Sequence, residues 1–218
     1  MQSNRLSVRG RRLRLGIASA ACALAACALP ATAMSANDTT QFSVVAGSLA
    51  FGTSPNVPNF PAVTLNGQSQ TINAQMANFS VSDATGSAAG WNVTTAGDNG
   101  AGKSAVFKQY NTSTSTYGSI ALAQNSLSLN STGAGFTAVG GTTGTAPTHS
   151  CGSGCFVDAA PGSPVKVSSA AANAGMGTWQ TSSYSSTSLA LATPSSLQAL
   201  GANEVYRVDL AWTLNSGP

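Results

Sequence analysis

The stretch Glu204-Val-Tyr-Arg-Val-Asp-Leu-Ala-Trp-Thr-Leu214, close to Pro218 at the C-terminus, decides the fold class of this chain. Its apolar side chains fall on every second position, and mostly polar side chains lie between them. A period of two places alternate side chains on opposite faces of a β-strand, so one face of this strand is apolar. We therefore expect the strand to close a sheet and the chain to end as an all-β domain. The apolar positions are Tyr206, Val208, Leu210, Trp212 and Leu214.

Further strand candidates recur through the chain, whereas helical patterns are nearly absent. Gly, Ser and Thr punctuate the sequence throughout, and no window shows a capped stripe of apolar residues at helical spacing. Many short strands separated by turn residues are typical of a sandwich or barrel. We predict an all-β fold, a single β-sandwich of roughly 8–10 short strands with long Gly/Ser/Thr-rich loops. The predicted strands are Gln41–Phe51, Pro61–Leu65, Gln70–Val81, Gly90–Thr95, Ser104–Gln109, Gly118–Leu129, Val165–Ser169, Ser188–Ala192 and Glu204–Leu214.

The N-terminal segment has the pattern of a secretory signal peptide. Five arginines precede an apolar run of small residues, Leu15–Leu29, which Pro30 breaks. Ala31-Thr32-Ala33 then fits an A-x-A cleavage site. The apolar run is shorter than the about 20 residues that span a membrane. We therefore predict a secreted protein with residues 1–33 as the signal peptide, residues 34–218 as the mature domain, and no transmembrane segment in the mature chain.

A lipoprotein signal is a second interpretation of the same segment. Leu24-Ala25-Ala26-Cys27 fits a lipobox, in which Cys27 is acylated and becomes the new N-terminus. Short Ala-rich apolar segments produce such tetrads by chance, and the A-x-A site follows just downstream. We favour soluble export and keep lipidation of Cys27 as the alternative.

The charge of the chain changes sign once the signal segment is removed. Residues 34–218 hold four Lys and Arg residues against six Asp and Glu residues, a net charge of −2, although the whole chain carries +3. No basic patch is left that would indicate a nucleic-acid partner. Only 7% of all residues are charged, against roughly 25% in an ordinary soluble domain. A neutral polar surface of this kind is typical of saccharide-facing and cell-envelope proteins, and also of passive extracellular β-domains.

Residues 131–164 are predicted to form one long loop that contains the only mature cysteines and the only histidine. A loop longer than about 15 residues inside a compact domain is usually functional or disordered. Export favours a local disulfide between Cys151 and Cys155, because the Gly-Ser-Gly spacer lets the sulfurs meet in an oxidising setting. The alternative is a metal site of both thiolates with His149 and Asp158. We favour the disulfide, with no metal bound and His149 exposed on the loop.

Catalytic patterns find little support in this sequence. A single histidine must serve any Ser-His-Asp arrangement, and no G-x-S-x-G elbow occurs. The carboxylates mostly stand singly in turns, where Asp bonds the turn backbone, and do not form pairs suited to glycoside hydrolysis. No phosphate-binding loop follows the glycine pairs. We expect no enzyme activity, no catalytic residues and no cofactor.

The three tryptophans are the strongest candidates for anchors or ligand contacts. Trp91 and Trp212 each lie on the apolar face of a predicted strand, so a core role is favoured over stacking on a sugar ring. Trp179 follows two glycines in a turn-rich context. It is therefore the tryptophan that we expect to be exposed, and it is the possible ligand contact.

The order of these motifs resembles the WxL domain, a family of Gram-positive surface proteins with two Trp-x-Leu motifs, the second of which closes the chain. Gly90-Trp91-Asn92-Val93-Thr94 is similar to the first motif, with Val93 in place of leucine. The second is matched by Tyr206-Arg-Val-Asp-Leu-Ala-Trp212-Thr-Leu214-Asn-Ser-Gly-Pro218. The segments Gly47–Gly52, Phe79–Asp83 and Gly175–Trp179 are also similar to the family pattern. Because both residues are apolar and suit a strand, Val93 is expected to keep the packing role of the leucine.

The resemblance implies a cell-surface protein that is retained non-covalently and binds peptidoglycan or another cell-wall glycan. Its expected location is secreted, at the cell surface or in the cell wall, and some family members also associate with other surface proteins. The Ala-rich, Lys-poor composition hints at a high-GC organism. The alternative is a structural or adhesive surface subunit, possibly lipid-anchored, that binds a protein partner.

Overall fold

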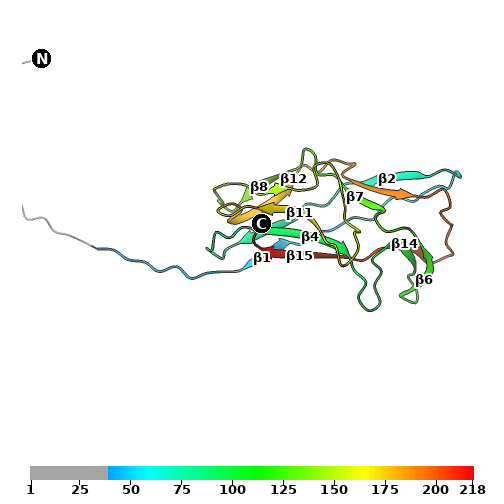
Figure 1. Cartoon of the computed structure of the whole chain (residues 1–218), viewed down its shortest axis with the longest axis horizontal. Helices are drawn as coiled ribbons and strands as arrows, with labels where there is room; N and C mark the ends of the chain where they lie inside the picture. The colour runs from blue at the N-terminus through cyan, green and yellow to red at the C-terminus, as the bar shows by residue number, and fades with distance from the viewer. Residues whose placement is uncertain (1–38) are drawn as a thin grey trace, which may run out of the picture. The chain divides into compact units, whose positions relative to one another are not determined.

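The computed structural model describes residues 39–218 of the chain (Figure 1). The predicted signal peptide and Cys27 lie outside the described residues. Residues 44–218 form one folded unit. Fifteen β-strands and no helix occur in residues 39–218, which confirms the predicted all-β class. Accordingly, this part of the chain contains no helix that is long and apolar enough to cross a membrane.

The strands form four antiparallel sheets, more than the single pair of sheets in a simple sandwich. Sheet A has the order β1-β3-β12-β8, sheet B has β10-β7-β13-β2, sheet C has β15-β4-β11-β9, and sheet D has β14-β5-β6. Their bounds in chain order are β1 Leu49–Thr53, β2 Gln70–Ala74, β3 Ser80–Asp83, β4 Trp91–Gly97, β5 Lys108–Asn111, β6 Thr116–Ala121, β7 Leu127–Leu129, β8 Gly135–Val139, β9 Thr148–His149, β10 Cys155–Phe156, β11 Val165–Ala170, β12 Gly177–Ser182, β13 Leu189–Thr193, β14 Glu204–Arg207 and β15 Leu210–Ser216.

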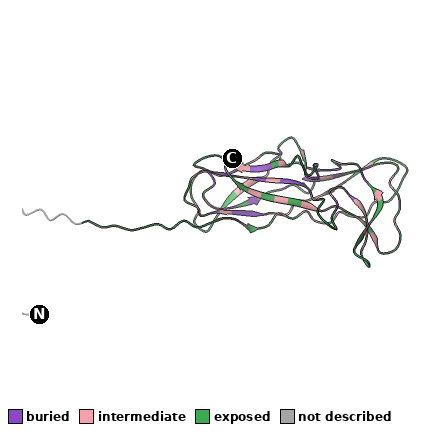
Figure 2. Cartoon of the chain, turned by 60° about the horizontal axis from the view of Figure 1, so that its bottom comes forward, coloured by how far each residue is buried: buried purple, intermediate pink, exposed green. Residues whose placement is uncertain are grey.

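Sheets A and C pack against each other and enclose the centre of the core (Figures 1 and 2). The ring of Phe79, next to β3, lies 6.4 Å from the ring of Trp212 in β15. The ring of Trp91 in β4 lies 6.1 Å from that of Phe136 in β8. Leucines of sheet B, among them Leu127 in β7, belong to the same buried cluster. The core is therefore continuous through three of the sheets.

Strand β4 is central because its sequence suits pairing on both sides. Trp91, Val93 and Thr95 alternate with smaller polar residues and are all buried. The strand pairs with β11 on one side and with β15 on the other, where Trp212 lies opposite Thr95. Alternating β-branched and aromatic residues on one face are what a half-buried pleated surface requires.

The predicted strand Glu204–Leu214 is in fact two strands in different sheets. β14 pairs with β5 in sheet D, and β15 pairs with β4 in sheet C. The chain leaves one sheet at Asp209, whose backbone N–H donates to Ser104 O and whose carbonyl accepts from Asp98 N–H, at 2.8 and 2.7 Å. The period of two nevertheless continues across the break, because all five apolar positions from Tyr206 to Leu214 are partly buried against the core.

Several other sequence-based boundaries were wrong. Residues 70–81 and 118–129 each contain two strands, β2 with the first residues of β3 and β6 with β7, and Pro61–Leu65 forms none. The predicted strand from Gln41 begins only at Leu49. The long loop 131–164 contains β8, β9 and β10, because strands of sheets A, B and C pair with these Gly- and Thr-rich segments.

Candidate functional site

An open groove with a volume of about 1170 Å³ lies on the folded unit of residues 44–218. One wall is the segment that runs from β14 into β15, including Tyr206 and Trp212. The facing walls are the proline-rich segment Pro55–Pro61 and the loop Leu197–Leu200. Pockets for drug-sized ligands have volumes of about 300–1000 Å³. The groove is therefore large enough to receive part of a longer molecule.

Aromatic side chains of the C-terminal motif line this groove. Tyr206 and Trp212 are both only partly buried, so each presents some of its ring to solvent. The Tyr206 hydroxyl donates to the carbonyl of Gln198 at 3.0 Å, which ties β14 to the opposite loop. Aromatic rings with an apolar face and a polar tip suit ligands that have both kinds of surface.

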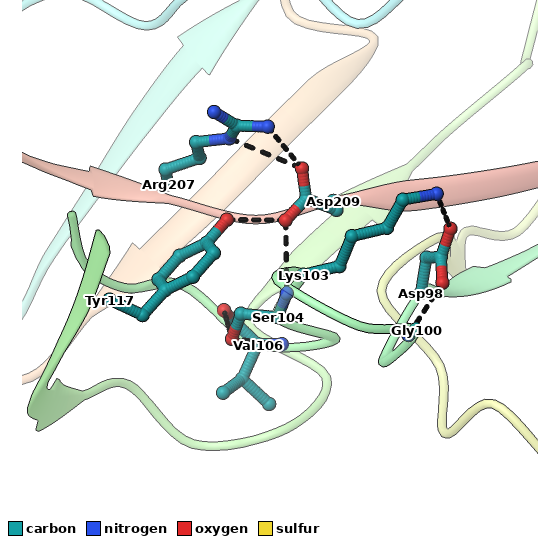
Figure 3. Close-up of polar contacts among 8 residues, drawn as sticks. All are labelled: Asp98, Gly100, Lys103, Ser104, Val106, Tyr117, Arg207 and Asp209. Carbon is teal, nitrogen blue, oxygen red and sulfur yellow. Dashed lines mark hydrogen bonds and ion pairs between the residues drawn. The ribbon is translucent and has the colours of Figure 1, made fainter. Parts of the chain in front are cut away.

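A charged cluster around Asp209 lies where β14 passes into β15 (Figure 3). Arg207 donates two hydrogen bonds to Asp209 Oδ1, from Nη2 at 2.6 Å and from Nε at 3.2 Å. The other carboxylate oxygen accepts from the Ser104 N–H at 2.9 Å and from the hydroxyl of Tyr117. The Arg207 guanidinium also lies 4.4 Å from the ring centre of Tyr110, within cation–π range. The cluster thus joins β5, β6 and the break between β14 and β15.

The hydrogen bonds of this cluster set the charge of its members. Burial by itself raises the pKa of Asp209, but the bonds from Tyr117, Ser104 and Arg207 favour the carboxylate and together lower that pKa. Burial, with the bond to Asp209, raises the pKa of the Tyr117 hydroxyl far above its usual range. Asp209 therefore remains an anion and Tyr117 a protonated donor at neutral pH.

We expect Asp209→Asn to destabilise the fold by about 1–3 kcal/mol at neutral pH, because it weakens hydrogen bonds to a charged acceptor. The pKa of Asp209 is lower in the folded than in the unfolded chain. Its stabilising contribution is therefore present above the unfolded pKa of about 4 and is lost as the pH falls through the folded pKa. The difference between wild type and variant should accordingly shrink in acid. Urea unfolding over a pH series measures it.

Asp98→Asn is the matched control for this prediction. Asp98 pairs with Lys103 at 2.5 Å, but both side chains are exposed in part, and an exposed ion pair contributes little. This variant should unfold like the wild type at neutral pH. An Asp209→Asn effect that persists unchanged in acid would contradict the charge assignment.

The first predicted motif is a core element. Trp91 and Val93 are completely buried in β4, and the Trp91 Nε1 donates to the carbonyl of Gly175 at 3.0 Å. Leu214 lies opposite Val93 across the β15–β4 pair and is partly buried. The structure therefore places Trp91, Val93 and Leu214 together, with Tyr206 and Trp212 continuing the same face toward the groove.

The expected exposure of Trp179 was wrong. Only 5% of this residue is accessible, and its Nε1 donates to the carbonyl of Met176 at 2.9 Å. The residue lies in β12, opposite Val81 in β3 and Ala138 in β8, and not in a turn. Because the residue is buried, the Trp179 ring is not exposed as a surface ligand contact.

The predicted disulfide is present, and it lies deeper than a loop tip. Cys151 and Cys155 are bonded to each other, and Cys151 belongs to the buried core. Their thiolates are consequently not free to bind a metal. His149 was expected to be exposed, but it is partly buried and its ring stacks on Phe136 at 4.6 Å. Burial lowers the pKa of His149, so the imidazole is neutral at neutral pH.

Asp158, which the sequence analysis considered as a possible metal ligand, has a structural role. Its carboxylate is fully buried and accepts hydrogen bonds from the backbone N–H groups of Ser126 and Leu127 at 2.8 and 3.1 Å. It therefore holds the start of β7. Within residues 39–218, no group of three or more His, Cys, Asp or Glu side chains is placed to hold a metal ion.

Sequence reasoning missed most of the groove. The prolines Pro55, Pro58 and Pro61 recur every third residue, a spacing that favours an extended non-strand segment and could have marked one wall. The two tyrosines that flank Arg207, Tyr110 and Tyr117, lie opposite each other in β5 and β6. No local pattern connects them with Asp209, because the three elements meet only in the folded chain.

The fold and the groove define a class of protein: an antiparallel β-domain whose C-terminal motif supplies both core residues and the wall of an open groove. The sequence model of the family described as "WxL domain surface cell wall-binding" matches residues 34–218. The chain therefore belongs to the WxL family of surface cell wall-binding domains, as the motif order indicated. No curated protein and no solved structure matches the chain.

Proposed function

We propose that this protein is exported and binds peptidoglycan non-covalently through the groove between β14–β15 and the segment Pro55–Pro61. The observation that carries the proposal is that Tyr206 and Trp212 of the C-terminal motif line the groove and remain partly accessible. Family membership supports a cell wall as the target. Although few residues of the chain are charged, five of them line this groove, so charged as well as neutral hydrogen bonds are available to a glycan: Asp98, Lys103, Glu204, Arg207 and Asp209.

The shape and chemistry of the groove agree with a polymeric ligand. It is open to solvent and combines apolar side chains such as Phe60 and Leu197 with polar groups such as Gln198. Sites of this composition bury apolar ligand faces while a few polar groups fix orientation. A sugar ring presents C–H faces and hydroxyl edges, which match these two kinds of surface.

Tyr206→Ala tests the proposal by co-sedimentation with sacculi from which proteins have been removed. We expect affinity to fall about 5–30-fold, corresponding to a loss of 1–2 kcal/mol from one central contact. Tyr206→Phe keeps the ring and loses only the bond to Gln198, so it should retain most binding. Phe156→Ala, at an exposed position of β10 outside the groove, is the matched control.

Two results would overturn parts of this proposal. If the wild type does not sediment with sacculi, peptidoglycan is not the ligand. If Tyr206→Ala remains folded and sediments like the wild type, the binding site lies elsewhere. Thermal unfolding of each variant separates loss of binding from loss of fold.

Export is proposed to end with cleavage after Ala33. The exported protein should therefore begin at Met34, because the A-x-A site follows the apolar run and Pro30 at the usual distance. Intact mass of the protein recovered from culture decides between this N-terminus and the alternative. A mass that includes a diacylglyceryl group on Cys27 would replace soluble export with lipid anchoring.

A further inference from the structure

The segment Thr39–Ala46, here termed the arm, exposes large apolar side chains that a linker would avoid. Phe42, Val44 and Val45 are 90%, 80% and 90% accessible, and the arm contains no charged residue. Flexible linkers are rich in small or polar residues. Contiguous exposed apolar residues, unlike scattered ones, are typical of interaction sites.

The arm has the sequence of a strand, but no strand is formed by residues 39–46. Phe42, Val44 and Ala46 alternate with Gln41, Ser43 and Val45, a period of two. Within residues 39–218, backbone pairing begins at Gly47, whose N–H donates to Ala84 O at 2.9 Å. Among the described residues of the folded unit, Val44–Ala46 make no backbone hydrogen bonds, so these strand-forming residues can pair with a further strand.

The free edge of sheet C offers a matching site. β15 is the edge strand of that sheet, pairs only with β4, and has seven residues without a charge. β1, the edge strand of sheet A, lies beside β15 (Figure 1). An edge strand presents a row of unpaired N–H and C=O groups and is a template for a further strand.

The side chains at these two edges are incompletely covered, unlike those of the strands next to them. The large apolar residues of β1 and β15 are all partly exposed, whereas Val81 in β3 and Trp91 and Val93 in β4 are completely buried. The core is thus open on the side where β1 and β15 meet. The partly exposed residues are Leu49, Phe51, Leu210, Trp212 and Leu214.

We propose that the arm of one copy of this protein adds as a strand to the free edge of β15 in a second copy. Phe42 and Val44 then cover the side chains of Trp212 and Leu214, and main-chain hydrogen bonds extend sheet C. In strand addition the backbone bonds supply affinity and the alternate side chains supply specificity. Neither segment carries a charge, so no ion is desolvated when they pair.

The geometry favours a second copy over the arm's own domain. Gly47 and the carbonyl of Ser48 already pair with Ala84 at the β1 edge. Because β1 itself lies beside β15, the arm would have to turn back along β1 to add to β15 of the same domain. That turn would use Val44–Ala46, which would then be unavailable as strand residues. Because donor and acceptor surfaces differ, two copies can exchange arms in a closed pair or join head to tail.

Sedimentation velocity of the exported protein, from nanomolar to high micromolar concentration, tests the proposal. We expect species of at least about twice the monomer mass, with a fraction that rises with concentration. The variant Phe42→Ser/Val44→Ser/Val45→Ser should be monomeric throughout with an unchanged melting temperature. The control Leu65→Ser/Val139→Ser/Phe156→Ser removes three other exposed apolar side chains and should still assemble.

Cysteine cross-linking identifies the acceptor strand. An oxidised mixture of Val44→Cys and Leu214→Cys proteins should give a disulfide-linked heterodimer, and Val44→Cys with Phe156→Cys should not. A wild type that is monomeric at every concentration would overturn the proposal. Assembly that survives the triple serine change would also overturn it, as would a cross-link at position 156 in place of 214. Neither measurement uses sacculi, so the outcome is independent of wall binding.

Discussion

Trp91→Ala is expected to lower the free energy of unfolding by about 3–5 kcal/mol, the usual cost of removing a buried tryptophan side chain. The Trp91 side chain is completely buried between sheets A and C, and its ring packs edge-on against Phe136. The change also leaves the carbonyl of Gly175 without its donor. Because whole domains are stable by only about 5–15 kcal/mol, this change should remove a substantial share of the total stability. Guanidinium unfolding followed by far-UV circular dichroism measures the loss.

Two variants serve as controls for the Trp91 prediction. Trp212→Ala removes a side chain that is only partly buried, so it should cost clearly less than Trp91→Ala. Gly175→Ala tests whether the backbone at residue 175 packs directly against the Trp91 ring. An added Cβ would meet Trp91 Nε1 at 2.7 Å and Ala170 Cβ at 2.3 Å, at a residue with φ of +70°. A Trp91→Ala protein as stable as the wild type would show that the ring does not anchor the two sheets.

Trp179→Ala should also be strongly destabilising, by about 3–5 kcal/mol, contrary to the expectation from its turn-rich sequence. The side chain is buried in the middle strands of sheet A, beside Val81 and Ala138. Trp179→Phe retains most of the apolar volume and loses the bond to the Met176 carbonyl, so it should cost about 1 kcal/mol. Thermal and guanidinium unfolding distinguish the two variants.

An unchanged melting temperature for Trp179→Ala would contradict the burial of this ring in β12. It would instead agree with an exposed tryptophan that is free to contact a ligand. The comparison therefore decides between a structural role and a binding role for the third tryptophan of the chain.

These assignments divide the C-terminal motif between stability and binding. Leu214 packs opposite Val93 in the core, whereas Tyr206 and Trp212 belong both to the core edge and to the groove wall. A change at Trp212 is consequently expected to affect fold, groove and strand edge together. Wall binding can be tested separately at Tyr206, and assembly can be tested separately at the arm residues.

Local alternation was sufficient to predict the strands that dominate the core. Trp91 and Val93 stand on one face of β4 and are buried, as their spacing indicated. The short spacer between Cys151 and Cys155, combined with the signal-peptide pattern, led to the observed disulfide. The motif order led to the family that the comparison confirms. In each case the information lies within a few residues or in their order along the chain.

The errors have a common physical cause, since the missed strands are stabilised by their neighbours. β8 and β12 contain strand-favouring Phe, Val, Trp and Thr residues, but each begins with Gly and is flanked by Gly- and Ser-rich segments that read as turns. They become strands because β12 is hydrogen-bonded between β3 and β8. Strand preference depends on cross-strand partners, which a single segment does not contain.

By itself the sequence determined the all-β class, the apolar face that runs through Tyr206 and Leu214, and membership of the WxL family. These follow from side-chain spacing and motif order, which are properties of the linear chain. Only the tertiary structure decided that this face is divided between two sheets at Asp209, that Trp179 is buried, and that the groove and the free edge of β15 exist. These features arise from contacts between segments far apart in sequence, and the pairing of such segments depends on the packing of the whole domain.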